Sequence, residues 1–429
     1  MFVFADTGGM GVPLSILGGC LPAMRNEADT GDFALAVGAR GSNQAAVRAY
    51  NERLVLSLVR QYGSMAKADI ARSTGLSAQT VSVIMRALEI DGLLLRGEPV
   101  RGKVGQPSVP MSLNPDGVYS IGLKIGRRSA DLILMDFVGT QKGHLHLTYP
   151  FPMPKSILEF VQSGTATLAA KLSDKARKQI AGIGIASPFE LWNWADEVGA
   201  PQGEMDAWRG FDMQEEIAAI SPYPVFLQND ATSACGAELV FGAGPRYPDF
   251  IYFFIGSFIG GGVVLNSSLY SGRTGNAGAI GSMPVPDGTG GSRQLIDAAS
   301  IFVLENMLRE NGIDPSPLWY APEDWIDFGK PLTDWIELTA KALAHAIVAS
   351  ASVLDFGAAI IDGGFPAWVR TRVVTATKLA ANKLDLQGIK LPDIIAGEVG
   401  DQARSLGGAS LPLFSRYLLD FNTPFKESH

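Results

Sequence analysis

Cysteine, histidine and charge are all scarce in this chain of 429 residues. Two cysteines, Cys20 and Cys235, and four histidines occur. Cysteines so few and so far apart exclude a disulfide framework and a zinc site built from Cys-x-x-Cys pairs. Charged residues make up 18% of the chain and hydrophobic residues 47%, with a formal net charge of −8. This composition is typical of a well-packed cytoplasmic protein, and the length predicts two or three domains.

Long hydrophobic runs are also missing, so we predict no membrane partner. The segment Phe2–Leu21 is apolar and glycine-rich, but Asp6 interrupts it and no basic start precedes it. It is therefore a poor signal peptide and too broken for a membrane helix, and no other stretch approaches a transmembrane span. We interpret residues 1–46 as a flexible leader, or as sequence upstream of the true start.

Residues 67–94 show the pattern of a helix-turn-helix. KADIARSTGLSAQTVSVIMRALEIDGLL reads as a short helix, a glycine turn and a longer helix. Gly75 can adopt the left-handed conformation that such a turn requires, Leu76 fills the joint, and Ser77 suits the N-cap. The longer helix has a predicted buried stripe at helical spacing, made by Val81, Ile84, Met85 and Leu88.

A glycine-laced basic hairpin, RGEPVRGKVGQPS, follows the second helix. Together with a first helix over 52–62, it predicts a winged helix-turn-helix DNA-binding domain over residues 47–113. Short polar side chains on the 77–90 helix suit the floor of a major groove, because they let the backbone approach the base edges. The predicted DNA-binding residues are Lys67, Ser77, Gln79, Thr80, Ser82, Arg86, Arg96, Arg101, Lys103 and Gln106.

The charge distribution supports contact between this domain and DNA. Nine Lys and Arg stand against five Asp and Glu between Arg48 and Pro107, a net of +4 on a chain of −8. This asymmetry is expected where one end of a protein meets phosphate. An ordinary helical hairpin with solvated Ser and Thr is the alternative interpretation.

Residues 114–429 read as an internally duplicated α/β body. Two strand–glycine turn–strand units, 119–139 and 251–272, predict two lobes with a cleft between them. Between and after these units we expect a helix over 156–172, a buried strand over 180–186 and an amphipathic helix over 334–354. Strands that alternate with helices favour mostly parallel or mixed sheets. Asn114-Pro-Asp-Gly is a predicted linker turn.

The order of the body's motifs resembles the ROK family of sugar kinases and repressors. The motifs are IGLKIG, GIGIASP, QNDATSACGAE, IGSFIGGGVVLN, GNAGAIGSMPV and IIDGG. With the winged helix, the chain is similar to the family's transcriptional regulators. The resemblance implies an α/β, two-lobed actin/hexokinase-like (ribonuclease H-like) ATPase fold.

The function that this resemblance implies is a DNA-binding repressor of carbohydrate-metabolism genes. Its implied partners are a double-stranded DNA operator, a sugar or sugar-phosphate effector, and further copies of the chain in a homodimer or homotetramer. The alternative is an ATP-dependent sugar kinase with an accessory N-terminal domain.

Compared with the family's kinases, the chain has lost its phosphate turns. Lys124 replaces the acidic residue before the first turn, and Arg127 and Arg128 replace its small residues. Phe258 places a bulky ring in the second turn. Because bulky residues prevent backbone amides from approaching phosphate, we expect no enzymatic activity and no cofactor.

The zinc ligands of the family's regulators are missing as well, so we predict no metal site. The family uses one histidine and three cysteines, but the matching segment here is Ala279-Ile280-Gly281-Ser282, and no cysteine lies between Asp287 and Asp297. His144 and His146 alternate along an apparent strand. We interpret them as a solvated strand face in preference to a metal pair.

The sugar-binding residues of the family are only partly retained. Asn229 and Asp230 remain, Ala279 and Ser282 replace a glutamate and a histidine, and Ile296 replaces a later glutamate. The predicted effector-binding residues are Asn229, Asp230, Ser282 and Asp297. Asp297 partly replaces the lost glutamate if the alignment of this segment with the family shifts by one residue. Asp230 either accepts a ligand hydrogen bond or caps the helix that follows.

Tryptophans and glycines near these motifs carry weaker signals. One of Trp192, Trp194 and Trp208 can stack on a ligand, although core or lid packing is the default. We interpret the glycine runs as fold-defining turns in preference to nucleotide contacts; they are Gly260-Gly261-Gly262, Gly363-Gly364 and Gly407-Gly408.

Overall fold

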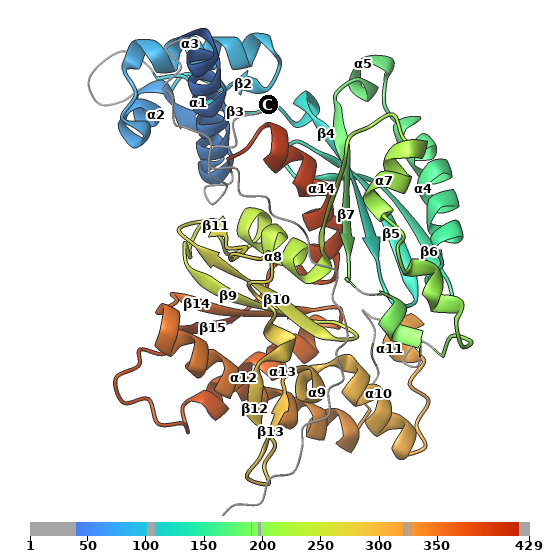
Figure 1. The fold of residues 1–429 in the computed structure, drawn as a ribbon. Coiled ribbons are helices and arrows are strands. Elements are labelled where there is room, and N and C mark those ends of the chain that lie inside the picture. The colour runs from blue at the N-terminus through green and yellow to red at the C-terminus, as the bar shows by residue number, and fades with distance from the viewer. Residues whose placement is uncertain are drawn as a thin grey trace, which may run out of the picture. The chain divides into compact units, whose positions relative to one another are not determined.

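The computed structural model describes residues 40–100, 108–189, 191–195, 199–320, 325 and 328–419 (Figure 1). The chain divides into two compact units, residues 1–45 and 46–429. All contacts discussed below lie within the second unit. The predicted leader lies mostly outside the described residues, and the first helix begins at Arg40.

The predicted winged helix-turn-helix domain, called the reader below, contains three helices and a small antiparallel sheet. The helices are α1 (Arg40–Tyr62), α2 (Lys67–Thr74) and α3 (Ala78–Ile90). The strands β1 (Met65–Ala66), β3 (Pro110–Leu113) and β2 (Leu94–Arg96) lie side by side in that order. The four apolar residues of the predicted stripe on α3 are buried, which confirms the helical period read from the sequence.

The first lobe of the body follows the short 3-10 turn Pro115–Gly117, which confirms the predicted linker turn. Its five-stranded sheet has the order β6-β5-β4-β7-β8. Strand β4 pairs antiparallel with β5 and parallel with β7. The strands are β4 (Tyr119–Ile125), β5 (Ser129–Asp136), β6 (Gln141–Thr148), β7 (Ile180–Ser187) and β8 (Val225–Asn229); the helices are α4 (Pro154–Ala169), α5 (Asp174–Arg177) and α7 (Met213–Ile220).

The second lobe repeats this sheet pattern, in the order β11-β10-β9-β14-β15. An antiparallel hairpin, β9–β10, is again extended by a parallel strand, β14. The predicted duplication of the body is therefore present. The strands are β9 (Phe250–Ile255), β10 (Ile259–Leu265), β11 (Ser268–Leu269), β14 (Ala358–Gly363) and β15 (Asp393–Ala396), with a separate hairpin of β12 (Pro284–Pro286) and β13 (Ser292–Gln294).

Helices of the second lobe pack on the sheet around a large apolar core. They are α9 (Ile296–Ala299), α10 (Ile301–Glu310), α11 (Pro317–Tyr320), α12 (Lys330–Leu354) and α13 (Ala367–Ala381). By length and composition α12 is apolar enough to cross a membrane, so the expectation that no stretch approaches a transmembrane span was wrong. Half of its apolar window is buried, and Trp335 and Leu343 lie in the lobe's core. We therefore assign α12 to that core.

Two further helices, α8 (Asp230–Phe241) and α14 (Ala403–Arg416), pack against each other between the sheets (Figure 1). Helix α8 contacts β10, and α14 contacts β4 and β7. The interpretation of Gly407-Gly408 as a turn was wrong, because both residues lie inside α14. A Cβ atom at Gly407 would collide with the Ser233 carbonyl of α8, so glycine is what allows the two backbones to approach.

The other two glycine runs give different outcomes. Gly260-Gly261-Gly262 lies within strand β10, where a turn was predicted, and a Cβ atom at Gly262 would come 2.6 Å from the Cβ of Cys235 on α8. Gly363 ends β14 and Gly364 bends away from it, which agrees with the predicted turn. Each of the three runs contains a glycine that serves close packing, since a Cβ atom at Gly363 would also collide with the Phe365 ring and the Ile255 carbonyl.

Candidate DNA-reading surface and ligand cleft

The turn between α2 and α3 has the geometry that the sequence predicts. Gly75 has a φ of +70° and ends α2, with its N–H donating to the Ala71 carbonyl. The Ser77 hydroxyl accepts a hydrogen bond of 3.1 Å from the Thr80 backbone N–H. Ser77 therefore caps α3 and satisfies one of the backbone donors that the first turn of the helix leaves unpaired.

The exposed face of α3 carries residues that can read base edges. Gln79, Val83 and Arg86 are exposed and recur at helical spacing. Lys67, at the start of α2, donates a 3.2 Å hydrogen bond to the Ser82 hydroxyl, so this pair belongs to the same surface. Val83 was missed by sequence reasoning, although its position four residues after Gln79 places it on this face.

The wing is described only at its base. Val100 and Ser108 exchange two backbone hydrogen bonds there, of 2.8 and 3.0 Å. Arg96 donates to both oxygens of Glu89, at 2.5 and 2.9 Å, and this contact lowers the pKa of Glu89. Arg96 therefore has a partner within the reader, which the sequence did not predict. The predicted contacts Arg101, Lys103 and Gln106 lie outside the described residues.

Helix α1 attaches the reader to the body. Arg53 donates to the backbone carbonyl of Phe414, within the last turn of α14, at 2.7 Å and to that of Leu418, just beyond the helix, at 2.9 Å. Arg60 donates to the Phe137 carbonyl at 2.7 Å, and burial lowers its pKa to about 10. One apolar cluster includes residues of the reader and of the body. The reader is thus packed onto the body, although the sequence suggested only a linker.

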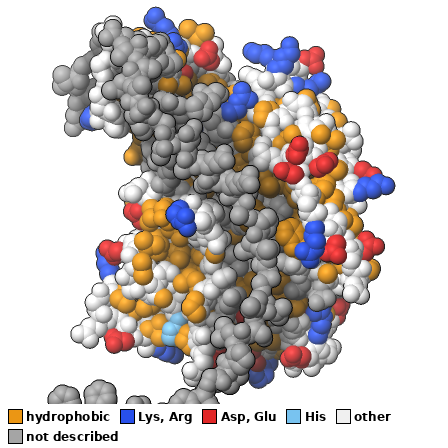
Figure 2. All heavy atoms as spheres, viewed as in Figure 1, with side chains coloured by type: hydrophobic (Ala, Val, Ile, Leu, Met, Phe, Trp, Pro, Cys, Tyr) orange, Lys and Arg blue, Asp and Glu red, His pale blue; other side chains and the backbone are white. Residues whose placement is uncertain are grey.

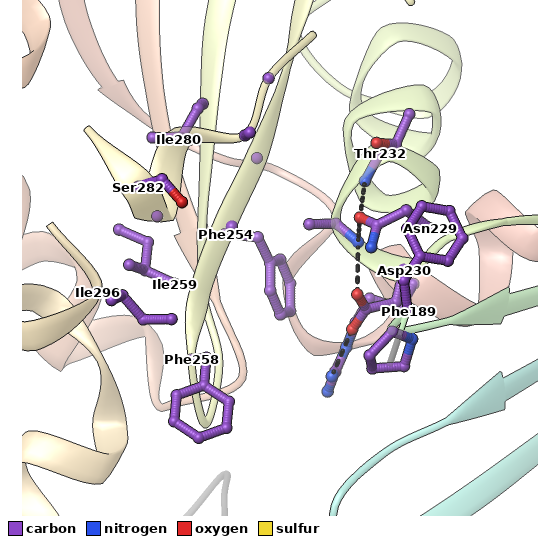
Figure 3. A pocket seen from close by; sticks show the side chains of 18 of the residues that line it. Phe189, Asn229, Asp230, Thr232, Phe254, Phe258, Ile259, Ile280, Ser282 and Ile296 are labelled. Atoms are coloured by element: carbon purple, nitrogen blue, oxygen red, sulfur yellow. Dashed lines mark hydrogen bonds and ion pairs between the residues drawn. The ribbon is translucent and has the colours of Figure 1, made fainter. Parts of the chain in front are cut away.

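A cavity of about 370 Å³ lies between the two lobes and contains three of the four predicted effector residues. Asn229 and Asp230 come from the junction of β8 and α8, and Ser282 from the 3-10 turn Ile280–Ser282. In Figure 3, Ser282 and Ile296 lie across the cavity from Asn229 and Asp230. Polar groups therefore face each other from both lobes.

Asn229, and not Asp230, caps helix α8. The Asn229 side-chain oxygen accepts from the backbone N–H groups of Ala231 and Thr232, at 3.1 and 3.3 Å. Asp230 is the first residue of the helix, and its second oxygen lies 3.4 Å from a guanidinium nitrogen of Arg404 on α14. The alternative that Asp230 is the N-cap was therefore wrong, and its carboxylate faces the cavity (Figure 3).

The prediction that Asp297 compensates for the lost glutamate was also wrong. Ile296 lines the cavity, whereas Asp297 is exposed and does not line it. Both residues belong to the short helix α9, where neighbouring side chains diverge by about 100°. Because Ile296 lines the cavity and Asp297 does not, the cavity wall is apolar at this point.

Aromatic side chains supply much of the remaining lining. Phe189, Trp194, Phe254 and Phe258 all border the cavity, and the Trp194 and Phe258 ring centroids lie 5.7 Å apart. Of the three tryptophans considered from the sequence, Trp194 alone lines it; Trp208 is buried. Phe189 and Phe254 were missed, because a phenylalanine beside a strand end has no signal that separates a cavity wall from a core.

The former phosphate turn, residues 126–128, is filled by protein charges. Arg127 forms a buried ion pair of 3.1 Å with Glu305 of α10. Lys124 lies 3.1 Å from Asp131, and burial, followed by the nearby charge of Arg404, lowers its pKa. These groups line a second cavity of about 850 Å³. The Gly126 N–H of this turn donates to the Ser129 carbonyl at 2.8 Å and so is not free for a nucleotide phosphate.

The fold and site define a class: a winged helix-turn-helix protein with an actin/hexokinase-like body of two lobes. The profile of the ROK family matches residues 120–297, and a profile described as winged helix-turn-helix DNA-binding matches residues 48–94. Over residues 120–297 the chain therefore resembles the ROK family, as its motif order predicted, and it has an N-terminal winged helix-turn-helix over residues 48–94.

Similar proteins agree with this assignment. The chain is 26% identical over 248 residues to the xylose repressor of Bacillus subtilis. The matched region covers 57% of this chain and 62% of the repressor. The chain therefore matches less than two thirds of that relative's length. A crystal structure of a ROK family transcriptional regulator, a homologue of the E. coli MLC protein, matches with a TM-score of 0.63 at 19% identity. The match covers 87% of this chain and 97% of that regulator.

The kinase branch of the family has the same body fold. A ROK family glucokinase from Streptomyces griseus, in complex with glucose and AMPPNP, has a TM-score of 0.53 at 21% identity. It covers 68% of this chain and 98% of the glucokinase. At this identity the likeness establishes the fold of the body and leaves its activity to the residues of the site.

Proposed function

We propose that this protein is a cytoplasmic transcriptional repressor of carbohydrate-metabolism genes that binds DNA through α3 and a sugar or sugar derivative in the cleft. The observation that carries the proposal is the exposed face of the capped helix α3, with Gln79, Val83 and Arg86 in line. An amide, a methyl-bearing side chain and a guanidinium suit adenine, thymine and guanine edges in the major groove. The named xylose repressor relative supports the same function.

Helix α14 supplies a physical connection between ligand and DNA. Arg404, near its beginning, lies 3.4 Å from Asp230 in the cleft. The carbonyls near its end accept hydrogen bonds from Arg53 of the reader. A sugar hydroxyl that competes for Asp230 would change the position of Arg404, and the rigid helix would transmit this displacement to α1. DNA must in turn change the affinity for the sugar by the same factor.

The lining of the cleft fits a neutral or weakly charged sugar. Asp230 and Ser282 offer hydrogen bonds to hydroxyl groups from opposite walls, while Phe254 and Phe258 offer apolar faces for the C–H side of a ring. The guanidinium of Arg404 lies 4.9 Å from the centroid of the Phe254 ring, which holds both side chains beside the ligand space. This mixture of few polar groups among aromatic rings is typical of small-molecule sites.

Phosphoryl transfer is not part of the proposed function. A kinase would need acidic groups for metal-bound ATP and small residues in its phosphate turn. This chain has Lys124 and the Arg127–Glu305 pair there instead. We therefore propose that the body senses its ligand without turnover, and that it presents two or four readers to a symmetric operator as a homodimer or homotetramer.

The proposal is tested by binding of the purified chain to DNA fragments that flank its own gene, over a range of salt concentrations. Gln79→Ala and Arg86→Ala should each weaken specific binding about 5- to 150-fold, the range for loss of one base contact. Arg177→Ala is the matched control, because Arg177 is a surface arginine of the first lobe paired only with Asp174 among its described ion pairs. If the chain shows no salt-sensitive preference for any of these fragments, the proposal is contradicted.

The kinase alternative requires a separate measurement on the same preparation. A coupled assay for ADP release, with ATP and a panel of pentoses, hexoses and amino sugars, should show no sugar-dependent turnover. Turnover that Asp230→Asn abolishes would establish the kinase and overturn the proposed sensing role. The DNA measurement would remain interpretable in either case.

A further inference from the structure

A cluster of three side chains lies outside both the reading surface and the sugar cavity. Asp131 on β5 stands directly opposite His146 on β6, and His144 is two residues earlier on the same face of that strand. One oxygen of Asp131 lies 2.9 Å from Nε2 of His144 and 2.6 Å from Nδ1 of His146. These three ligand-type atoms all lie within 4.8 Å of one another. The sequence showed only the two histidines, and the sheet register adds the carboxylate.

We propose that Asp131, His144 and His146 form a binding site for a divalent transition-metal ion such as Zn²⁺. Two imidazole nitrogens and one carboxylate oxygen are donors that Zn²⁺, Co²⁺ and Ni²⁺ accept, whereas Mg²⁺ and Ca²⁺ prefer oxygen alone. Without metal, Nε2 of His144 and Nδ1 of His146 face the Asp131 oxygen as hydrogen-bond donors; on metal binding each neutral imidazole carries its proton on the other ring nitrogen and offers the lone pair of the facing nitrogen to the ion. The site is separate from the segment at residues 279–297, where the family's zinc ligands are missing.

The surroundings of the cluster favour access and orientation. The two histidine side chains are 44% and 49% exposed, so an ion can enter from solvent. All three residues line the cavity of about 850 Å³, which leaves room for water or a ligand atom at a fourth position. Asp131 itself is held by Lys124, whose ammonium lies 3.1 Å from the other carboxylate oxygen.

Lys124 sets both the orientation and the strength of the proposed site. By binding one oxygen of Asp131, it directs the other oxygen toward the imidazoles. A neighbouring ammonium also repels a metal cation, so binding is weaker than in a site without it. The proposed ion is consequently an exchangeable one, and the hydrogen-bonded cluster is the form of the site without metal.

Isothermal titration of ZnCl₂ into the full chain, without an affinity tag and after treatment with a chelator, tests the proposal. We expect one Zn²⁺ per chain at this site. His144→Ala, His146→Ala and Asp131→Asn should each weaken it at least about tenfold, because each removes a direct ligand, and loss of even an outer-shell partner costs about 10- to 100-fold. His345→Gln is the matched control, since this half-buried histidine lies on α12 and is not part of the cluster.

A spectroscopic measurement identifies the ligands independently of affinity. Co²⁺ bound to the wild-type chain should show the visible absorption of a four-coordinate site, and the double variant His144→Ala/His146→Ala should lose it. Circular dichroism should show that the variants remain folded, because both histidines are exposed on an edge strand. Equal Zn²⁺ affinity in the wild type and the double variant would overturn the proposal and leave a hydrogen-bonded cluster without a metal function.

Discussion

Arg127 and Glu305 join the two lobes through a buried ion pair. Their side chains are each 2% exposed and 3.1 Å apart, and Arg309 also contacts Glu305. The Arg127 guanidinium lies 5.2 Å from the centroid of the Phe302 ring and 5.6 Å from that of Trp319. This arginine therefore occupies the turn that a kinase would use for phosphate, and fixes α10 of the second lobe against the first.

Removal of one partner of this pair should be costly. Glu305→Leu leaves a buried guanidinium without its carboxylate, so we expect the free energy of unfolding to fall by about 3–5 kcal/mol. The double variant Arg127→Met/Glu305→Leu should recover most of the loss, because apolar side chains of similar size can replace a buried pair. Urea denaturation of the wild type, both single variants and the double variant completes the cycle. Similar destabilisation in the double and single variants would show that the pair itself is not the cause.

Single residues also show how far the sequence could be interpreted. Ser77 and Gly75 were predicted correctly, because an N-cap and a left-handed turn depend on local backbone geometry. The capping role of Asn229 in place of Asp230 could not be predicted, since both residue types are good caps. That choice depends on Arg404, which lies 174 residues later and attracts the Asp230 carboxylate.

At the scale of elements, α14 depends on two glycines that the sequence suggested were a turn. Their pairing predicted a bend, yet the segment is helical because the contact with α8 stabilises it. Gly408 lies against the β7 backbone near Gly184, and Gly407 lies against the Ser233 carbonyl of α8. Tertiary contact here outweighs the low helix propensity of glycine, about 1 kcal/mol per residue relative to alanine.

Gly407 and Gly364, one crowded and one open, give a pair of variants for comparison. Gly407→Ala gains about 1 kcal/mol of helix propensity but places a methyl group against the Ser233 carbonyl, with an overpacking cost near the upper end of about 1–3 kcal/mol. We expect a net loss of about 1–2 kcal/mol in urea denaturation. Gly364→Ala should change stability by less than about 0.5 kcal/mol, because no described atom lies within 4 Å of its added Cβ. A Gly407→Ala protein as stable as the wild type would exclude close packing as the reason for glycine.

Most elements, in contrast, could be predicted from period and composition. The buried stripe of α3, the hairpins β4–β5 and β9–β10, and the strand β7 all lie where the sequence placed them. The spacing of apolar residues and the positions of glycine turns depend on the local sequence, so they can be recognised before the tertiary structure is known. The apolar helix α12 shows the limit, since its composition fits a membrane span and its place in the core decides otherwise.

At the scale of the whole molecule, the connection between cleft and reader passes through α14 and α1. On the face shown in Figure 2, basic and acidic side chains are interspersed over the described part of the body. Long-range electrostatic attraction therefore explains a coupling between the cleft and the reader less well than packed contacts do. The apolar cluster shared by α1, α3 and the end of α14 is such a contact.

Substitution of Arg53 tests this connection. In Arg53→Met the donors to Phe414 and Leu418 are lost while α3 is unchanged, so DNA affinity without sugar should stay within about threefold. A sugar that weakens wild-type DNA binding by the usual 5- to 150-fold should weaken that of Arg53→Met by about twofold or less. The measurement is fluorescence anisotropy of labelled DNA with a sugar panel that includes D-xylose, with Arg177→Met as control. An unchanged sugar response in Arg53→Met would exclude this route.

The sequence by itself determined the winged helix-turn-helix, the duplicated α/β body and the loss of the phosphate turns, because each depends on local period, capping or residue size. Only the tertiary structure decided which side chains meet: Ile296 and not Asp297 in the cavity, Arg404 beside Asp230, and Asp131 between two histidines. These pairings join residues from separate elements. They follow from sheet register and helix packing, which hold distant segments together without a local signal in the chain.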